Sequence, residues 1–381
     1  MAGRYRPQPL HRQCKRLKGV VPGCAKRYPG AAAPHIPSAD ADYRAPVQTG
    51  ETANMRKFCI AVLAPILTVA FAGAAAAQES YTLKIACVLD PQHPILIGAR
   101  HMAEVAEKES GGRLKINVYP SSQLGGQREV LQNTQAGVVD GVIDATATLT
   151  NFVPQLGVVD LPYLAKDPAA AFRLFDSPVF EQELGRPAAA AGFHIVQVWE
   201  VTFRNVYTRS KPINAVADLK GQKIRVIPSP SYIALFRALG AAPTPMAFGE
   251  VYTALQQGVI DGAENDAVTY QTTKHMEVAR NLALTSHMML ANTLYMSERV
   301  WQRLPDDIRA VIAKASVEAR KTVTAERTAR DAKALDDIRA AGVNVTQPDL
   351  APFRDIGQQT YKELSERLGP ELVARIVEVT K

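Results

Sequence analysis

The chain has 381 residues, 47 % of them hydrophobic, which is enough for a large core that we expect to be divided between two lobes. Residues 1–77 hold 11 of the 44 basic and 3 of the 37 acidic residues. The net charge of +7 therefore belongs to this end, and residues 78–381 carry a net charge of −1. Such a distribution gives no support for a nucleic-acid-binding protein, and we expect no nucleic-acid partner.

The segment that begins at Met55 has the pattern of a secretory signal peptide. Two cationic residues precede an apolar stretch, and an Ala-rich end fits the small-residue rule for cleavage before Gln78. We interpret 55–77 as a signal peptide, with a short membrane anchor as the alternative. Residues 1–54 are interpreted as disordered, or as sequence upstream of the true start. The sequence therefore predicts an exported protein.

Strand and helix signals alternate from residue 78 onward. This rhythm is typical of an α/β protein with a mostly parallel sheet. Cys87 is the only cysteine in this part, so it can form neither an internal disulfide nor a thiolate metal cage, and we expect a buried small hydrophobe. In chain order we expect strands at 81–89, 114–120, 138–147, 193–201, 223–227, 244–248 and 258–265, and helices at 95–109, 125–137, about 168–187, 231–239 and 250–257.

An internal repeat supports two similarly built lobes. "EVLQNTQAGVVDG" (129–141) and "EVYTALQQGVIDG" (250–262) align without gaps and are identical at seven of thirteen positions. Each copy predicts a helix that ends at a glycine, a tight turn and a strand; coincidence between two ordinary units is the alternative. Because ligands bind beyond the carboxyl ends of strands in open α/β sheets, two facing lobes predict a cleft between them.

A long helical pattern covers 304–342, with one proline at its start and no glycine before its end. A helix of this length would span roughly 50 Å, which exceeds one lobe. We therefore expect it to lie across both lobes. A coiled coil is the alternative, but no heptad repeat persists.

Motifs for catalysis, nucleotide binding and metal binding are absent from the sequence, and the histidines have no ligand spacing. We therefore expect no catalytic residue, no cofactor and no metal site. Four polar residues instead lie at the ends of expected strands in the second half: Arg204, Arg225, Glu264 and Asn265.

Arg225 is the most informative of the four. It stands between Ile224 and Val226 in a strand that we expect to be buried, and a buried guanidinium needs an anion nearby. That anion could be internal, from Glu200, Glu250 or Asp218, or it could arrive with a ligand. A guanidinium on a rigid strand presents two parallel donors to a carboxylate, a geometry that lysine cannot copy.

The segment "KPINAVADLKGQKIRVIPSPSYIALFRALGAAPTPMAFGEVYTALQQGVIDGAEN" resembles the DctP-like solute-binding proteins of tripartite ATP-independent periplasmic (TRAP) transporters. The resemblance extends to "KESGGRLKINVYPSSQLGGQREVLQNTQAGVVDG" and the long helix, and so covers nearly all of 80–381. It implies a two-lobed periplasmic-binding-protein fold, with hinge strands and a long lobe-spanning helix. It also implies that a small carboxylate ligand is delivered to integral membrane subunits driven by an ion gradient. We expect a monomer in the periplasm.

The resemblance also implies site residues and lobe boundaries. Arg225 matches the family's carboxylate clamp, Arg204 its second arginine and Asn265 the asparagine that follows Glu264 in the DGxEN turn. Phe248 fits a wall of the pocket, and His93 and Thr146 are first-lobe candidates, for which a helix-start role and a plain strand role are the alternatives. We expect lobe 1 at 78–201 plus about 290–329, and lobe 2 at 202–289 plus about 330–381.

Two other functions fit the same sequence. An exported enzyme using Glu264 as a base would lack an evident nucleophile, and a sensor-associated binding protein would have the same sequence features. The identity of the acid stays open between a dicarboxylate, a keto acid and a sugar acid. A departure from relatives at Ile227-Pro228, directly after the clamp strand, predicts a different loop beside Arg225.

Overall fold

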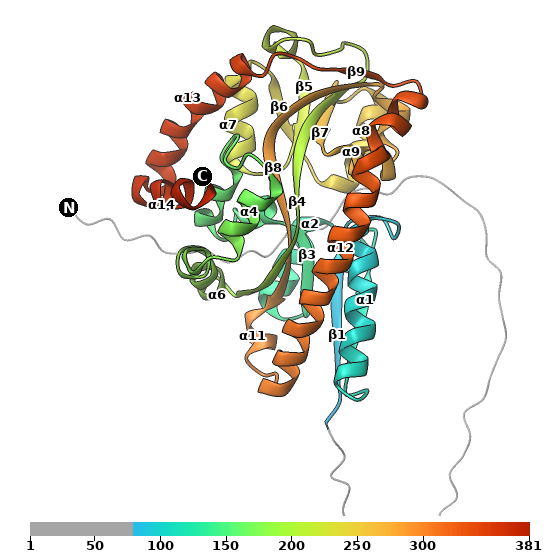
Figure 1. Cartoon of the computed structure of the whole chain (residues 1–381), viewed down its shortest axis with the longest axis vertical. Coiled ribbons are helices and arrows are strands. Elements are labelled where there is room, and N and C mark those ends of the chain that lie inside the picture. The colour runs from blue at the N-terminus through green and yellow to red at the C-terminus, as the bar shows by residue number, and fades with distance from the viewer. Residues whose placement is uncertain (1–78) are drawn as a thin grey trace, which may run out of the picture. The chain divides into compact units, whose positions relative to one another are not determined.

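The computed structural model describes residues 79–381, which form an α/β body around one mixed sheet (Figure 1). The expected signal peptide at 55–77 and the segment 1–54 lie outside the described residues. The strand order is β2-β1-β3-β8-β4-β7-β5-β6, and β9 pairs with β8 beside this path. The strands are β1 (Tyr81–Cys87), β2 (Leu114–Tyr119), β3 (Gly141–Ala145), β4 (Phe193–Thr208), β5 (Lys223–Val226), β6 (Ala242–Pro245), β7 (Gly262–Asn265), β8 (Asn281–Ser297) and β9 (Asn344–Thr346).

Helices follow most strands, and several begin where the sequence supplies a cap or a proline at the first turn. His93 caps α1, and its ring accepts a hydrogen bond from the amide of Ile95. The α-helices are α1 (Pro94–Glu109), α2 (Gln127–Ala136), α3 (Thr146–Leu149), α4 (Pro168–Phe175), α5 (Pro178–Phe180), α6 (Arg186–Ala190), α7 (Pro230–Ala238), α8 (Val251–Gln257), α9 (Ala267–Thr272), α10 (His275–Val278), α11 (Glu298–Trp301), α12 (Asp306–Ala340), α13 (Ala351–Leu368) and α14 (Pro370–Thr380). Short 3₁₀ or π turns are η1 (Pro154–Asp160), η2 (Glu181–Gly185), η3 (Val216–Leu219) and η4 (Phe248–Glu250).

The sheet divides into two lobes that share its two longest strands. Lobe 1 contains β1 with its parallel neighbours β2 and β3, and lobe 2 contains β5 with its parallel neighbours β6 and β7. The antiparallel strands β4 and β8 run through both lobes between them (Figure 1). Three irregularities interrupt the pairing of β4 with β8, the last between Arg204 and Val206. The expected two-lobed fold with hinge strands is confirmed.

The helix α12 connects the lobes along one side of the sheet. It packs against α1 of lobe 1, against β4 and against α9 of lobe 2 (Figure 1). Its 35 residues correspond to roughly 50 Å at 1.5 Å per residue. Asp306 and Asp307 in its first turn and Arg339 in its last turn have the signs that the helix dipole favours. The expected lobe-spanning helix is confirmed.

The two copies of the sequence repeat have the same structure, and the aspartate found in both copies makes the same kind of hydrogen bond in each. Each copy is a helix, a glycine with positive φ and a strand, with Gly137 and Gly258 at φ 79° and 75°. Asp140 accepts a hydrogen bond from the amide of Lys84 (2.7 Å), and Asp261 accepts one from the amide of Lys223 (2.8 Å). Each aspartate thereby ties the repeat to the neighbouring strand β1 or β5.

Two expected segments differ in extent from the structure for local reasons, and three further elements were not expected. The helix expected at 168–187 is broken after Phe175, because Pro178 starts a new turn that Ser177 caps. The strand expected at 244–248 is β6, which ends at Pro245 so that Phe248 lies in a turn. Two prolines are tolerated in β6 because it is an edge strand. The 17-residue strand β8 and the helices α13 and α14 were not anticipated.

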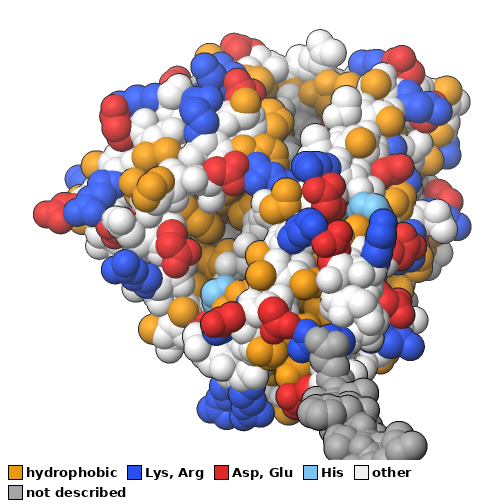
Figure 2. Space-filling view, turned by 60° about the horizontal axis from the view of Figure 1, so that its bottom comes forward, with side chains coloured by type: hydrophobic (Ala, Val, Ile, Leu, Met, Phe, Trp, Pro, Cys, Tyr) orange, Lys and Arg blue, Asp and Glu red, His pale blue; other side chains and the backbone are white. Residues whose placement is uncertain are grey.

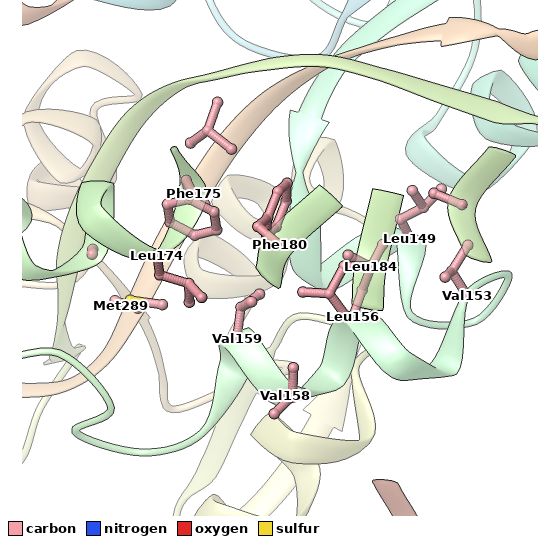
Figure 3. Packing of buried hydrophobic residues seen from close by; sticks show 14 of the residues in the cluster. Leu149, Val153, Leu156, Val158, Val159, Leu174, Phe175, Phe180, Leu184 and Met289 are labelled. Carbon is pink, nitrogen blue, oxygen red and sulfur yellow. The ribbon is translucent and has the colours of Figure 1, made fainter. Parts of the chain in front are cut away.

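Buried aliphatic and aromatic side chains hold η1 and α4 to α6 against the central strands (Figure 3). The rings of Phe175 and Phe180 meet edge to face with centroids 5.2 Å apart. The helix α14 packs against α4 and α13 packs against α7, so the C-terminal helices contact elements of both lobes. Cys87 is buried and unbridged, as expected for a small hydrophobe, and burial raises the pKa of its thiol to about 12.

Lys and Arg side chains are interspersed with Asp and Glu on the face shown in Figure 2, and this face has no large area of a single sign. Within residues 79–381, no helix combines the length and the apolar character needed to cross a membrane.

Candidate ligand-binding site

A narrow cavity lies between the lobes beside the central strands and has a volume of about 40 Å³. Lobe 2 and the central strands supply most of its polar groups, and lobe 1 supplies Asp144 and Gln127. Among the residues expected from the sequence, Arg204, Arg225, Asn265 and Phe248 line the cavity, whereas Glu264, Thr146 and His93 lie behind its walls. The remaining wall residues are Val88, Leu89, Ala145, Ile227, Thr269, Leu290 and Asn292.

Arg225 brings a buried positive charge to the cavity and forms no ion pair with any of residues 79–381. It is 2 % exposed, and its Nε and Nη2 donate to the carbonyl of Met246 at 3.1 and 2.9 Å. No carboxylate within residues 79–381 forms an ion pair with it, including the three internal candidates Glu200, Glu250 and Asp218. Burial lowers the pKa of Arg225 to about 10, and the nearby charge of Glu264 opposes this shift only in part.

Arg204 is buried as deeply, but its charge is neutralised within the protein. Its Nε and Nη2 contact both carboxylate oxygens of Glu264, Nη2 at 2.9 Å from Oε1, and Nη1 donates to Oδ1 of Asn265 at 2.8 Å. Burial acts to lower the pKa of Arg204, but Glu264 raises it above its usual value. In the same way, Arg204 and His287 overcome the effect of burial and lower the pKa of Glu264. The two arginines of the cavity therefore differ in free charge.

Glu264 does not line the cavity but holds the guanidinium of Arg204 in position. It has no exposed area, and its Oε2 also lies 3.6 Å from Nε2 of His287. A bidentate carboxylate fixes the plane of the guanidinium, since both of its oxygens match the fork of donors. Asn265 is fixed as well, because its Oδ1 accepts from Arg204 and from the amide of Asp266.

Asp144 and Gln127 form the polar wall of lobe 1, and sequence reasoning missed both. Asp144 accepts hydrogen bonds from Nε2 of Gln127, from Oγ1 of Thr148 and from the amide of Ala145, each at 2.8 Å. Burial raises the pKa of Asp144, and these donors together with Arg225 oppose the rise. Oε1 of Gln127 accepts from the amide of Phe248 at 3.2 Å, so this side chain also joins lobe 1 to lobe 2.

The repeat contained the signal that would have found Asp144. Gly141 and Gly262 begin equivalent strands, and the third residue after each of them is Asp144 or Asn265. Both side chains line the cavity. Extending the repeat by three residues would therefore have added a first-lobe carboxylate to the prediction.

His93 and Thr146 have structural contacts. Because Nδ1 of His93 accepts from the amide of Ile95, the neutral ring carries its hydrogen on Nε2, which donates to Oγ1 of Thr269 at 3.1 Å. Burial lowers the pKa of His93 to about 4, so the ring is uncharged at neutral pH. Oγ1 of Thr146 donates to the carbonyl of Ala291 at 2.9 Å and holds the end of β3 against β8.

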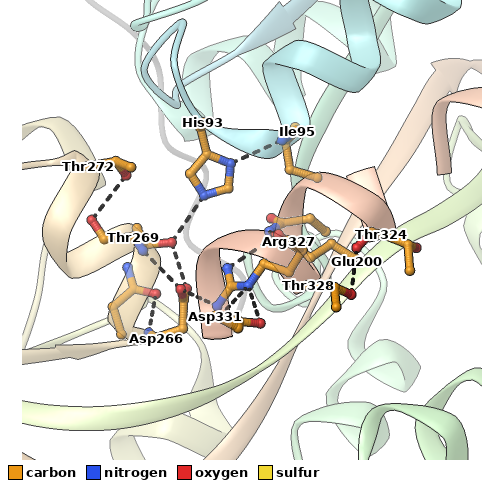
Figure 4. A network of polar contacts seen from close by, with 12 residues as sticks. His93, Ile95, Glu200, Asp266, Thr269, Thr272, Thr324, Arg327, Thr328 and Asp331 are labelled. Carbon is orange, nitrogen blue, oxygen red and sulfur yellow. Dashed lines mark hydrogen bonds and ion pairs between the residues drawn. The ribbon is translucent and has the colours of Figure 1, made fainter. Parts of the chain in front are cut away.

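A network of hydrogen bonds and ion pairs connects the contact between His93 and Thr269 to the long helix α12 (Figure 4). Thr269 donates to Asp266, and Nη2 of Arg327 on α12 contacts the other oxygen of Asp266 at 2.6 Å. Arg327 also lies 3.4 Å from Glu200, whose second oxygen accepts from Asn292 at 2.7 Å. Thr269 and Asn292 line the cavity, so its wall is anchored to α12 through these carboxylates.

A wider groove of about 530 Å³ begins on the other side of Gln127. Pro228, in the loop that follows β5, lines this groove, and its carbonyl accepts from Nδ2 of Asn151 at 2.8 Å. Asn151 belongs to lobe 1, so the loop after β5 forms a contact between the lobes. In the part of the chain that the structure describes, no group of three or more His, Cys, Asp or Glu residues could hold a metal ion.

The family model for bacterial extracellular solute-binding proteins, family 7 (DctP), matches residues 85–368.

The chain belongs to this family.

Its relatives include the sialic acid-binding periplasmic protein SiaP of Vibrio cholerae, which is 32 % identical over 85 % of this chain and 98 % of that protein. The sugar acid-binding protein DctPAm of Advenella mimigardefordensis, solved with galactonate, superposes with a TM-score of 0.77 at 26 % identity, over 79 % of this chain and 98 % of that one. A TRAP solute-binding protein of Sulfurospirillum deleyianum, solved with succinate, gives 0.75 at 29 % identity, over 79 % and 99 % of the two chains.

These similarities confirm the expected family and fold. The family consists of solute-binding proteins, and several relatives are TRAP periplasmic proteins solved with small carboxylates. The chain is accordingly a TRAP-type solute-binding protein of the DctP family. The relatives differ among themselves in ligand, since galactonate has one carboxylate and succinate has two.

Proposed function

We propose that this protein captures a small organic acid by pairing the acid's carboxylate with Arg225, and delivers it to the membrane subunits of a TRAP transporter. The observation that supports the proposal is the buried guanidinium of Arg225, which lacks an anion within the described residues. Leaving such a charge uncompensated is costly, so a carboxylate that enters the cavity gains a strong, charge-assisted partner.

The other predicted residues either contact the ligand or hold the residues that do. Asn265 and Phe248 contact the ligand directly, because both line the cavity. Arg204 contacts the ligand through the one N–H that Glu264 and Asn265 leave over, and Glu264 holds Arg204 in place. His93 and Thr146 hold the wall of the cavity and do not contact the ligand.

Ligand entry requires the lobes to separate, because a cavity of about 40 Å³ has room for a few water molecules. The acid would pair with Arg225 of lobe 2, after which lobe 1 closes over it with Gln127 and Asp144. Closure is favoured only to the extent that the ligand binds the closed state more tightly than the open state. The closed protein would then dock on membrane subunits that use an ion gradient.

The place of action follows from the same proposal. Two of the relatives named above, SiaP and the Sulfurospirillum deleyianum protein, are periplasmic proteins, and the interpretation of 55–77 as a signal peptide agrees with export to that compartment. We propose a monomer that binds without chemical conversion of the ligand and without a cofactor.

A thermal-shift screen tests the proposal. The purified protein is mixed with a panel of monocarboxylates, dicarboxylates, keto acids and sugar acids, and the melting temperature is measured. At roughly 1,000-fold excess over the dissociation constant, binding stabilises the native state by about 4 kcal/mol, so at least one acid should give a clear shift.

The same shift should be absent from Arg225→Met, whose own melting temperature shows whether it is folded. If no acid shifts the wild-type protein, the proposal is wrong. Conversion of the bound acid, followed by mass spectrometry, would instead support the enzyme alternative.

A further inference from the structure

The cavity contains one guanidinium that has no ion-pair partner among residues 79–381. Arg204 is paired with Glu264 through both carboxylate oxygens, and His287 beside them is held neutral because burial lowers its pKa. Arg225 has only the Met246 carbonyl as an acceptor within residues 79–381. The positive charge available to a ligand is therefore that of Arg225 alone.

The opposite wall adds negative charge. Asp144 is 4 % exposed, and both of its oxygens accept hydrogen bonds from Gln127, Ala145 and Thr148. These hydrogen bonds and the charge of Arg225 favour the ionised carboxylate, whereas burial raises the pKa of Asp144. A second carboxylate on the ligand would face this group, and like charges in a poorly solvated site repel one another strongly.

The remaining polar groups of the cavity are neutral. Asn265 accepts through Oδ1 from Arg204 and Asp266, so its Nδ2 points to no acceptor among residues 79–381. Asn292 donates from Nδ2 to Glu200, which leaves its Oδ1 as an acceptor. Such amide groups bind hydroxyl or carbonyl oxygens of a ligand without adding charge.

We infer that the ligand is a monocarboxylic acid whose other polar groups are neutral, such as a polyhydroxy acid, and that dicarboxylates are discriminated against. This inference rests on the proposed function and deepens it, since it names the substrate class of the same site. Two residues cause the discrimination. Glu264 neutralises the charge of Arg204, and Asp144 repels a second carboxylate of the ligand.

Matched pairs of acids test the inference on the wild-type protein by isothermal titration calorimetry. The pairs are D-galactonate with galactarate and D-erythronate with meso-tartrate, whose members differ only in a terminal CH₂OH or carboxylate. In at least one pair the monocarboxylate should bind at least tenfold more tightly. If the monocarboxylate binds more tightly in neither pair, while some acid binds in the wider screen, the inference is overturned and the proposed function stays intact.

If no acid of either kind binds in calorimetry or in the wider thermal-shift screen, the proposed function fails, and this inference fails with it. The two failures are therefore distinguishable. Binding of a pair with the expected preference supports both.

The variant Asp144→Asn tests the source of the discrimination. It removes a negative charge at constant size and should reduce the preference for the monocarboxylate about tenfold, mainly by improving binding of the dicarboxylate. Asp176→Asn is the control, since Asp176 carries the same charge at the surface, where it pairs with Arg320. An unchanged preference in a folded Asp144→Asn protein would show that Asp144 does not exclude the second carboxylate.

Discussion

Lobe 1 and lobe 2 are built on one backbone pattern, yet they bring opposite charges to the cavity. In each lobe a strand that begins at Gly141 or Gly262 pairs with a parallel strand and with one of the two long antiparallel strands. The register of these pairings identifies equivalent positions. The pairs, lobe 1 first, are Asp144 and Asn265, Asn292 and Arg204, and Ala86 and Arg225.

Two lobes with the same strand arrangement differ in the charge of the side chains that they place at the cavity. Lobe 2 has arginine at two of the three positions, whereas lobe 1 has an amide and an alanine there and a carboxylate at the third. The strands fix where the side chains lie, and the side chains alone fix the charge. An anion is therefore attracted to lobe 2, and lobe 1 closes over whatever part of the ligand remains.

The largest expected effect separates the two arginines of lobe 2. Arg204→Met leaves Glu264 buried without its partner, and we expect the free energy of unfolding to fall by about 3–5 kcal/mol. Arg225→Met removes only contacts with the Met246 carbonyl and should cost at most about 1.5 kcal/mol. Urea denaturation of both variants measures the difference. Equal losses would show that the charge of Arg225 is compensated in the protein after all.

A second prediction concerns the contact through which His93 of lobe 1 meets Thr269 of lobe 2. In the unfolded chain His93 takes up its proton near pH 6.5, but in the folded protein only near pH 4. Between these values the unfolded state binds more protons, so the unfolding free energy falls as the pH is lowered. The difference in pKa corresponds to about 3 kcal/mol over this range.

The histidine contribution can be isolated by substitution. His93→Gln should weaken the pH dependence of the unfolding free energy between pH 6.5 and 4, measured by denaturation at several pH values. His101→Gln is the control, because His101 lies partly exposed on the same helix that His93 caps. Identical pH profiles for the wild type and His93→Gln would contradict the assignment of a neutral, buried ring.

A third prediction tests whether the lobes are equivalent in backbone packing. A Cβ atom at Gly141 would lie 2.7 Å from the carbonyl oxygen of Tyr295, and one at Gly262 would lie 2.5 Å from that of Tyr207. We expect Gly141→Ala and Gly262→Ala each to lower the unfolding free energy by about 1–3 kcal/mol, because backbone atoms must move. Thermal unfolding with Gly126→Ala as control checks this, since a Cβ at Gly126 meets nothing within 4 Å. A loss in one lobe only would break the equivalence.

The smallest expected effect concerns the geometry of the clamp. Arg225→Lys retains the charge but replaces a planar fork of donors with a single ammonium. We expect at least roughly tenfold weaker binding of the best ligand, about 1.4 kcal/mol, measured by calorimetry. Unchanged affinity would show that Arg225 has a structural role, and binding of the carboxylate could then no longer be assigned to lobe 2.

Much of this architecture could be predicted from the sequence, because local patterns determine it. The helices at 94–109, 230–238 and 306–340 each begin at or directly after a proline and contain no further proline before their ends, and His93 also caps the first of them. The strand β8 could not be recognised, because it is buried on both faces along most of its length and its apolar residues do not alternate.

The candidate site was predictable only in part, for a related reason. Arg225 attracts attention because a charge in a buried strand is unusual, and the same argument applies to Arg204. The sequence could not show that Arg204 is already paired, since Glu264 lies 60 positions away and on a different strand. It also could not show that Gln127 and Asn292 reach the cavity, because amides are common on helices and strands of every kind.

The shared strands β4 and β8 have a mechanical consequence. The lobes are joined by a hydrogen-bonded ladder instead of by separate linkers, so any rotation between them must bend that ladder. Its three irregularities mark the places where bending is easiest, since extra residues there release the regular pleat. The joint therefore has stiffness. Any movement that separates or closes the lobes must deform this ladder, so the cost of the deformation subtracts from the free energy that ligand binding can supply.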